Sequence, residues 1–223
     1  MWLSKVAIIN YRSCKCLQLN FHKDQPNIFI GINDCGKSTI LMGIGLLFDK
    51  KLKFFFQSDE KKKSDISNTR LTRRAFDEFM IENDWPVISY TEEECLIIGE
   101  LVVEEGDGLD ELSNQLRWTI ESQTENKLTL AIVFRETDQS DETYLLAPDH
   151  PDTPKLYTST QAHLNKLRGE LEIQPNEIIN ENQVGRPTNY EIMRAIYNRH
   201  DALIWEWVSY KPDNRNDKEF WPP

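Results

Sequence analysis

Apolar and polar positions alternate near the start of the chain. Val6 and Ile8 fall on one side of this pattern, and Leu17 and Leu19 repeat it further along. A period of two is typical of β-strands, because successive side chains point to opposite faces. The polar residues 12–13 lie between the two segments. The pattern therefore predicts two short strands joined by a turn.

The pattern changes after residue 27. Residues 28–30 (Ile-Phe-Ile) form a short apolar run of the kind found in a buried central strand. A glycine-bearing loop follows, and residues 38–48 then carry apolar side chains at helical spacing. Gly43 and Gly45 lie inside this predicted helix, where each costs about 1 kcal/mol relative to alanine. They suggest close packing against the sheet, although a frayed helix fits equally well. Residues 73–83 predict a second helix.

From residue 94 onward, strand-like runs are separated by short groups of turn residues. The predicted strands are 95–103, 115–122, 127–134 and 143–146. Regular spacing of this kind indicates an antiparallel meander. After a proline-bearing stretch the pattern becomes helical, over 159–172 and 189–208. The chain is thus expected to have an α/β (α+β) fold with a central sheet, an antiparallel β-subdomain and C-terminal helices.

Composition places the chain among ordinary globular proteins. It has 223 residues with 39% apolar side chains and a net charge of −11, enough to form a core in one large or two small domains. No apolar run approaches the roughly 18 residues of a membrane span, and no secretory leader is recognisable. Four cysteines lack the spacing of a zinc site or a disulfide framework, namely Cys14, Cys16, Cys35 and Cys95. Free thiols in the reducing cytoplasm, with no membrane contact, are the expectation.

Charge is distributed unevenly along the sequence. Residues 91–150 contain 16 acidic and 3 basic side chains, a balance that repels phosphates and excludes a nucleic-acid groove there. Between Lys50 and Arg74 the balance reverses, with nine basic against three acidic side chains. This is either a solvated loop or a surface facing DNA or a partner, with aromatic residues 54–56 beside it. Any contact with DNA is expected to be indirect and confined to Lys50–Arg74.

The strongest chemical signal is the stretch GINDCGKS, residues 31–38. It matches the phosphate-binding loop G-x-x-x-x-G-K-[ST] and lies between a predicted buried strand and a predicted helix, as that loop requires. In this arrangement, backbone N–H groups and the helix N-terminus converge on one anion. A glycine turn that happens to precede Lys and Ser is the alternative interpretation.

Each residue of the loop has an expected role. Gly31 and Gly36 permit close approach of the backbone to phosphate. Lys37 offers its charge to the β- and γ-phosphates, and Ser38 offers a hydroxyl ligand to Mg²⁺. Thr39 can reach the α-phosphate. The remaining loop residues are expected to shape the loop or contact the nucleotide, and they are Asn33, Asp34 and Cys35.

The first sixty residues resemble a known family. The motif residues 10–13 (Asn-Tyr-Arg-Ser), the run 28–31 and the loop 33–39 are similar to the N-terminal lobe of ABC-type ATPases of the SMC, RecF and OLD group. The Asn-Asp-x-Gly-Lys variant, with residues 53–59 after it, most resembles OLD-family nucleases, including the Gabija-type antiphage nuclease. This resemblance implies ATP with Mg²⁺, an Arg12 that can approach the nucleotide, and assembly of ATPase heads into a homodimer or larger complex.

The departures from that family are equally informative. The chain contains no Walker B strand ending in aspartate, no serine-glycine signature loop and no D-x-D element of a nuclease centre. We therefore expect an ATPase N-lobe over 1–158, with the phosphate loop at 31–39 and the β-subdomain at about 91–147. A helical segment, 159–223, begins a region that is incomplete. Alone, this half-site is expected to bind ATP without turnover.

The same residues bear on other possible functions. A nucleotide-sensing module that binds ATP without hydrolysis and regulates a partner nuclease or effector is the alternative to the ATPase lobe. A guanine-specific N-K-x-D string and a G-x-S-x-G elbow are both absent, which disfavours GTPases and serine hydrolases. The four histidines are scattered and are expected to be surface residues or helix partners, at His22, His150, His163 and His200.

Overall fold

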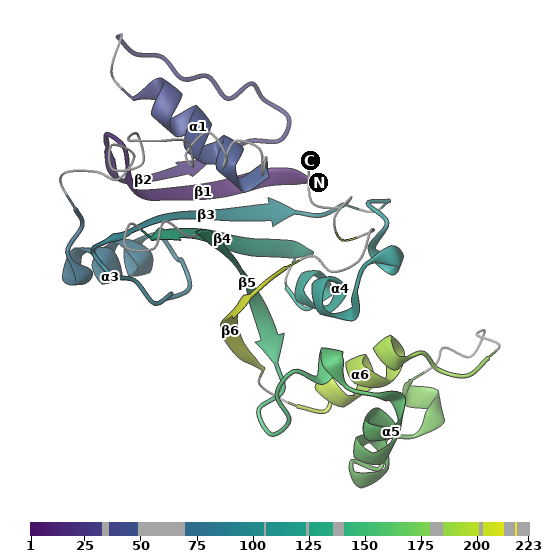
Figure 1. The fold of residues 1–223 in the computed structure, drawn as a ribbon. Coiled ribbons are helices and arrows are strands. Elements are labelled where there is room, and N and C mark those ends of the chain that lie inside the picture. The colour runs from purple at the N-terminus through teal and green to yellow at the C-terminus, as the bar shows by residue number, and fades with distance from the viewer. Residues whose placement is uncertain are drawn as a thin grey trace.

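The structure is a computed structural model with one continuous β-sheet, helices against it and a helical lobe beyond one end (Figure 1). It describes residues 1–32, 36–48, 70–104, 106–123, 125–135, 141–178, 185–200, 203–211 and 217. No helix within these ranges is both long and apolar enough to cross a membrane.

Six antiparallel strands form the sheet, in the order β2-β1-β3-β4-β5-β6. Their bounds are β1 (Trp2–Tyr11), β2 (Cys14–Asn20), β3 (Glu94–Val102), β4 (Lys127–Arg135), β5 (Asp141–Asp149) and β6 (Ile204–Ser209). The two predicted N-terminal strands and the turn at 12–13 are confirmed. The strands predicted near 95–103, 127–134 and 143–146 are also present. They share one sheet with β1, which pairs directly with β3.

Alternation along the strands divides the core between the two faces of the sheet. Val6 and Ile8 point to the face covered by α1 (Lys37–Phe48) and α4 (Asn114–Glu121). Ala7 and Ile9 point to the opposite face, which α3 (Arg73–Glu82) covers. All four side chains are fully buried. The helices predicted at 38–48 and 73–83 are confirmed.

Glycine allows α1 to lie directly on the sheet. A Cβ on Gly43 would lie 2.8 Å from Ile8 Cδ1, and a Cβ on Gly99 of β3 would lie 2.6 Å from Leu47 Cδ1. Both distances are shorter than a normal carbon–carbon contact of about 3.5–4.0 Å. Close packing at Gly43 thus explains why the helix accepts its poor propensity.

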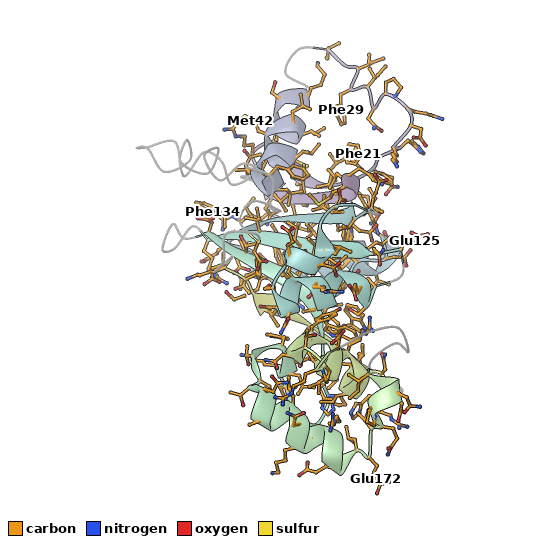
Figure 2. All side chains as sticks on the ribbon, turned by 90° about the vertical axis from the view of Figure 1, so that its right-hand side faces the viewer. Phe21, Phe29, Met42, Glu125, Phe134 and Glu172 are labelled. Atoms are coloured by element: carbon orange, nitrogen blue, oxygen red, sulfur yellow. The ribbon has the colours of Figure 1, made fainter. Side chains whose placement is uncertain are left out.

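A third core forms the lobe beyond β5. It contains α5 (Gln161–Glu170), α6 (Asn189–Tyr197) and the short helices η3 (Leu156–Thr158) and η4 (Pro175–Glu177); a further turn, η2 (Leu109–Glu111), precedes α4. Trp118 of α4 enters this core and stacks on Tyr197 with ring centroids 4.7 Å apart and an interplanar angle of 12°. Figure 2 shows Glu172, in this lobe, at the opposite end of the molecule from Met42 on α1. The helix predicted at 159–172 is confirmed.

One predicted strand is a helix, and part of one predicted helix is a strand. The strand predicted at 115–122 is helix α4, because Ser113 caps its N-terminus by accepting from Leu116 N–H and because Arg117 pairs with Glu121 one turn on. The apolar side chains of Leu116, Trp118 and Ile120 alternate as in a strand. The helix instead buries Leu116 and Ile120 in the core under the sheet and Trp118 in the core of the helical lobe. The helix predicted over 189–208 ends at Asn198, and residues 204–209 form the edge strand β6.

The predicted central strand at 28–30 is also wrong. These residues belong to no strand, and Ile28 and Ile30 are 74% and 90% exposed. A buried strand needs a neighbouring strand to pair with its backbone N–H and C=O groups, and packed elements to cover its side chains. The described part of the chain supplies none at this position.

Candidate functional site

The phosphate-loop motif ends at the N-terminus of α1, as its mechanism requires, but residues 28–30 before it form no strand. Gly36 immediately precedes the helix with φ +90°, a conformation that favours glycine, and its carbonyl accepts from Ile40 N–H at 3.0 Å. The first N–H groups of an α-helix lack intrahelical partners and carry its positive partial charge. The described part of the motif therefore provides an anion-binding helix end. Asn33, Asp34 and Cys35 lie outside the described residues.

Lys37 closes the described part of the loop. Its Nζ donates to the carbonyls of Gly31 and Ile32, each at 2.6 Å. Both hydrogen bonds are exposed to solvent. Phosphate oxygens can therefore replace the two carbonyls as acceptors for the ammonium at little desolvation cost. The side chain is thus held at the loop before any anion binds, and the loop residues fit a nucleotide phosphate.

Ser38 and Thr39 occupy the first turn of α1 in different environments. Ser38 is exposed and free to offer its hydroxyl to a cation, whereas Thr39 is 9% exposed. Among the described residues, no group of three His, Cys, Asp or Glu side chains could hold a metal ion. Ser38 is the described loop residue that would offer a ligand to Mg²⁺, and the roles of both residues remain predictions.

Arg12 lies in the turn after β1 and across the surface of α1. Its φ is +51°, its Nη1 lies 2.9 Å from Met42 Sδ, and its guanidinium carbon lies 5.5 Å from the centroid of the Tyr11 ring. Met42 is one turn beyond the phosphate loop. This placement puts Arg12 beside the helix that carries the loop, and its contact with nucleotide stays a prediction.

Sequence analysis included Asn10 and Ser13 in the 10–13 motif but assigned neither of them a role at the site. Ser13 Oγ lies 3.5 Å from Thr39 Oγ1, and a Cβ on Gly36 would lie 3.4 Å from the same Ser13 oxygen. Asn10 is fully buried near the end of β1 with φ +53°. Its signals in the sequence are its place in the 10–13 motif and a short polar side chain at the end of an apolar strand. The turn between β1 and β2 is therefore part of the site.

Several apolar side chains before and after the loop motif are exposed. Ile28, Ile30 and Ile32 are 74%, 90% and 82% exposed, and Leu41 on α1 is 56% exposed. Every residue of α1 after Thr39 is apolar or glycine. A helix that is apolar on all sides is normally buried on all sides. We call the exposed side chains of Ile28, Ile30, Ile32 and Leu41 the loop-side surface.

Only part of the predicted basic patch can be described. Residues 49–69, and with them Lys50, lie outside the described residues. Arg73 pairs with Asp77 and Arg74 with Glu78, and Arg70 donates to the Glu92 carbonyl at 3.3 Å. Exposed pairs of this kind contribute little to stability. They do reduce the charge that this end of the patch offers to DNA.

His150 is buried against the end of α6, so it fits the second of its two predicted roles, surface residue or helix partner. Its ring lies 3.8 Å from the ring of His200, centroid to centroid, and is 4% exposed. His150 Nδ1 accepts N–H groups from Asp152 at 3.1 Å and Thr153 at 2.8 Å. The proton of the neutral ring is therefore on Nε2, so neither ring nitrogen has a lone pair for a metal. The pair is a structural contact between β5 and the end of α6.

Protonation of His150 is expected to destabilise the fold. Burial, and then the neighbouring His200, hold its pKa below the ordinary 6.5. As pH falls below about 6.5, the unfolded chain takes up a proton that the native state refuses, so the free energy of unfolding falls, by at most about 1.4 kcal/mol per pH unit. His150→Asn keeps an acceptor near Nδ1 without titrating. Urea unfolding at pH 7, 6 and 5 should show a smaller decline for this variant, and equal declines would refute the assignment.

The geometry indicates the class of protein first: a phosphate-loop motif that ends at a helix N-terminus is typical of P-loop nucleotide-binding proteins. The sequence places it more closely, because residues 1–220 match the family described as AAA ATPase domain. The chain belongs to this family. Membership confirms the predicted P-loop ATPase fold and supports ATP as the nucleotide.

One solved structure comes from work titled "Structural biochemistry of ATP-driven dimerization and DNA stimulated activation of SMC ATPases." It is similar over 83% of this chain and 87% of that chain, at 14% identity and a TM-score of 0.41. No curated protein is significantly similar to this chain.

Proposed function

We propose that this chain is the ATP-binding lobe of an OLD-like ABC ATPase from an antiphage-defence or DNA-processing system. The observation that carries the proposal is the Lys37 ammonium, 2.6 Å from two loop carbonyls at the N-terminus of α1. When ATP binds, Lys37 exchanges these carbonyls for β- and γ-phosphate oxygens. The N–H groups of the first turn of α1 face the same phosphates, and Ser38 holds Mg²⁺, which neutralises their charge.

The loop-side surface supports the view that the lobe works with further polypeptide. Soluble monomers rarely expose large contiguous apolar patches. Ile28, Ile30 and Ile32 are exposed at every second position of a segment that pairs with no strand among the described residues. A strand laid beside residues 28–32 would pair their backbone groups. The same added segment would be the source of the Walker B carboxylate, which the sequence of this chain does not contain. We propose that additional sequence or a partner chain supplies it.

The proposal extends to assembly and location. Two ATPase heads facing each other would each complete the other's nucleotide site, giving a homodimer or a larger complex. A nuclease or effector partner would use the resulting ATP-dependent change, and DNA would approach through Lys50–Arg74 only. The free thiols of Cys14, Cys16 and Cys95 fit a reducing, cytoplasmic location.

A second candidate is a nucleotide-sensing module that binds ATP without hydrolysis. It is favoured by one observation: the described residues near the loop include no carboxylate cluster able to share Mg²⁺ with Ser38. In this case, ATP binding would order the loop and the turn at residues 12–13 for recognition by a partner. The two candidates differ in whether any partner restores turnover.

Calorimetric titration of ATP, with and without Mg²⁺, into the wild-type chain tests the proposal, together with a phosphate-release assay on the same samples. We expect saturable binding that Mg²⁺ strengthens, and no phosphate release. Absence of binding would reject the nucleotide site. Phosphate release by the chain alone would reject the half-site and show that the catalytic groups are already present.

A further inference from the structure

Asn10 is a buried polar residue in an unusual backbone conformation. It is fully buried, and its φ of +53° lies in the left-handed region. Asparagine tolerates this region better than most residues, but the conformation is still disfavoured in an isolated chain. Surrounding contacts must therefore select it.

Those contacts form a closed ring of hydrogen bonds, which we call the Asn10 clamp. Asn10 Oδ1 accepts from Leu71 N–H at 2.9 Å, and Nδ2 donates to the Glu94 carbonyl at 3.1 Å and to the Tyr90 hydroxyl. The Tyr90 hydroxyl donates in turn to the Leu71 carbonyl at 2.9 Å. The clamp thus ties the end of β1 to the segment before α3 and to the start of β3. Fully satisfied buried networks of this kind are rigid.

The residues just after the clamp touch the phosphate loop. Ser13 Oγ lies 3.5 Å from Thr39 Oγ1 and close to Gly36, and Arg12 Nη1 lies 2.9 Å from Met42 Sδ on α1. Arg12 is itself left-handed, with φ +51°. Only Tyr11 separates the two left-handed residues, so the backbone conformation at Asn10 determines where the turn at residues 12–13 lies against α1.

We infer that Asn10 is a positioning residue for the nucleotide site, acting through the turn at residues 12–13 rather than by touching nucleotide. The inference rests on the proposed ATP-binding function. The clamp holds the left-handed backbone at Asn10, and this backbone holds Ser13 against the loop and Arg12 across α1. Loosening the clamp lets the turn move away from the loop. Nucleotide affinity then falls, although every residue of the phosphate loop is intact.

Tyr90→Phe tests this inference without altering β1. It removes one hydroxyl from the clamp, and Tyr197→Phe is the matched control because it removes a buried hydroxyl that bonds Asp149 Oδ1 at 3.4 Å, at the far end of the sheet. We expect Tyr90→Phe to weaken ATP binding about fivefold, within the range for residues that act through packed neighbours. Tyr197→Phe should bind ATP as the wild type does. Urea unfolding of both variants separates this effect from lost stability.

Asn10→Gly provides a second variant. It keeps access to positive φ but removes the amide, so it should weaken ATP binding at least as much as Tyr90→Phe. Unchanged affinity in Tyr90→Phe and Asn10→Gly, or an equal loss in Tyr197→Phe, would overturn the inference while leaving ATP binding intact. No binding by the wild-type chain would instead overturn the proposed function, and the inference with it.

Discussion

Lys37→Ala is expected to weaken ATP binding by about 100-fold. The ammonium is held at the loop by the Gly31 and Ile32 carbonyls, and charged hydrogen bonds contribute about 1.5–3 kcal/mol each. Losing about 2.7 kcal/mol corresponds to a 100-fold weaker affinity. No other described lysine side chain bonds the loop in this way, so no neighbour replaces it. Calorimetric titration with ATP and Mg²⁺ measures the change.

Lys23→Ala is the control for lost positive charge. Lys23 is also exposed. It pairs with Glu104, two residues after the end of β3, rather than with the loop. It should leave ATP affinity unchanged. Because the bonds from Lys37 to the Gly31 and Ile32 carbonyls are exposed to solvent, the urea midpoint of Lys37→Ala should be close to that of the wild type. An affinity loss shared by both variants would mean that overall charge, and not the loop, attracts the nucleotide.

Trp118→Ala is expected to produce the largest loss of stability, about 3–5 kcal/mol, as for other large-to-small core substitutions. Trp118 is 5% exposed, stacks on Tyr197 and belongs to the core of the helical lobe. Its neighbours Leu116 and Ile120 on α4 belong to the core under α1. The indole is thus the part of α4 that joins the lobe to the sheet, and urea unfolding measures its contribution.

Trp205→Ala separates this effect from the general loss of an indole. Trp205 is on the edge strand β6 and is 40% exposed, so we expect a cost of about 1 kcal/mol from the area it does bury. Hydrogen exchange should show faster opening of α5 and α6 in Trp118→Ala and not in Trp205→Ala. Equal losses in the two variants would contradict the joining role of α4.

The sequence and the structure agree best where local chemistry decides the outcome. Alternation predicted β1 and β2, helical spacing predicted α1 and α3, and the loop motif predicted an anion-binding helix end. The family match over residues 1–220 confirms the ATPase class. The strand, helix and loop predictions rest on neighbouring residues alone, because alternation, helical spacing and the loop motif are each visible within a few positions.

Tertiary contacts decided the rest. Residues 28–30 have the pattern of a buried strand, yet Ile30 is 90% exposed, because a strand exists only where another strand pairs with it. Residues 114–121 are a helix although alternate positions are apolar, because α4 buries one side under the sheet and the other in the helical lobe. His150 and Asn10 gave almost no signal, since their burial depends on residues about 50 to 84 positions away. The sequence thus determined the phosphate loop and the type of most elements, whereas the pairing of distant segments determined which surfaces are buried and what holds the loop in place.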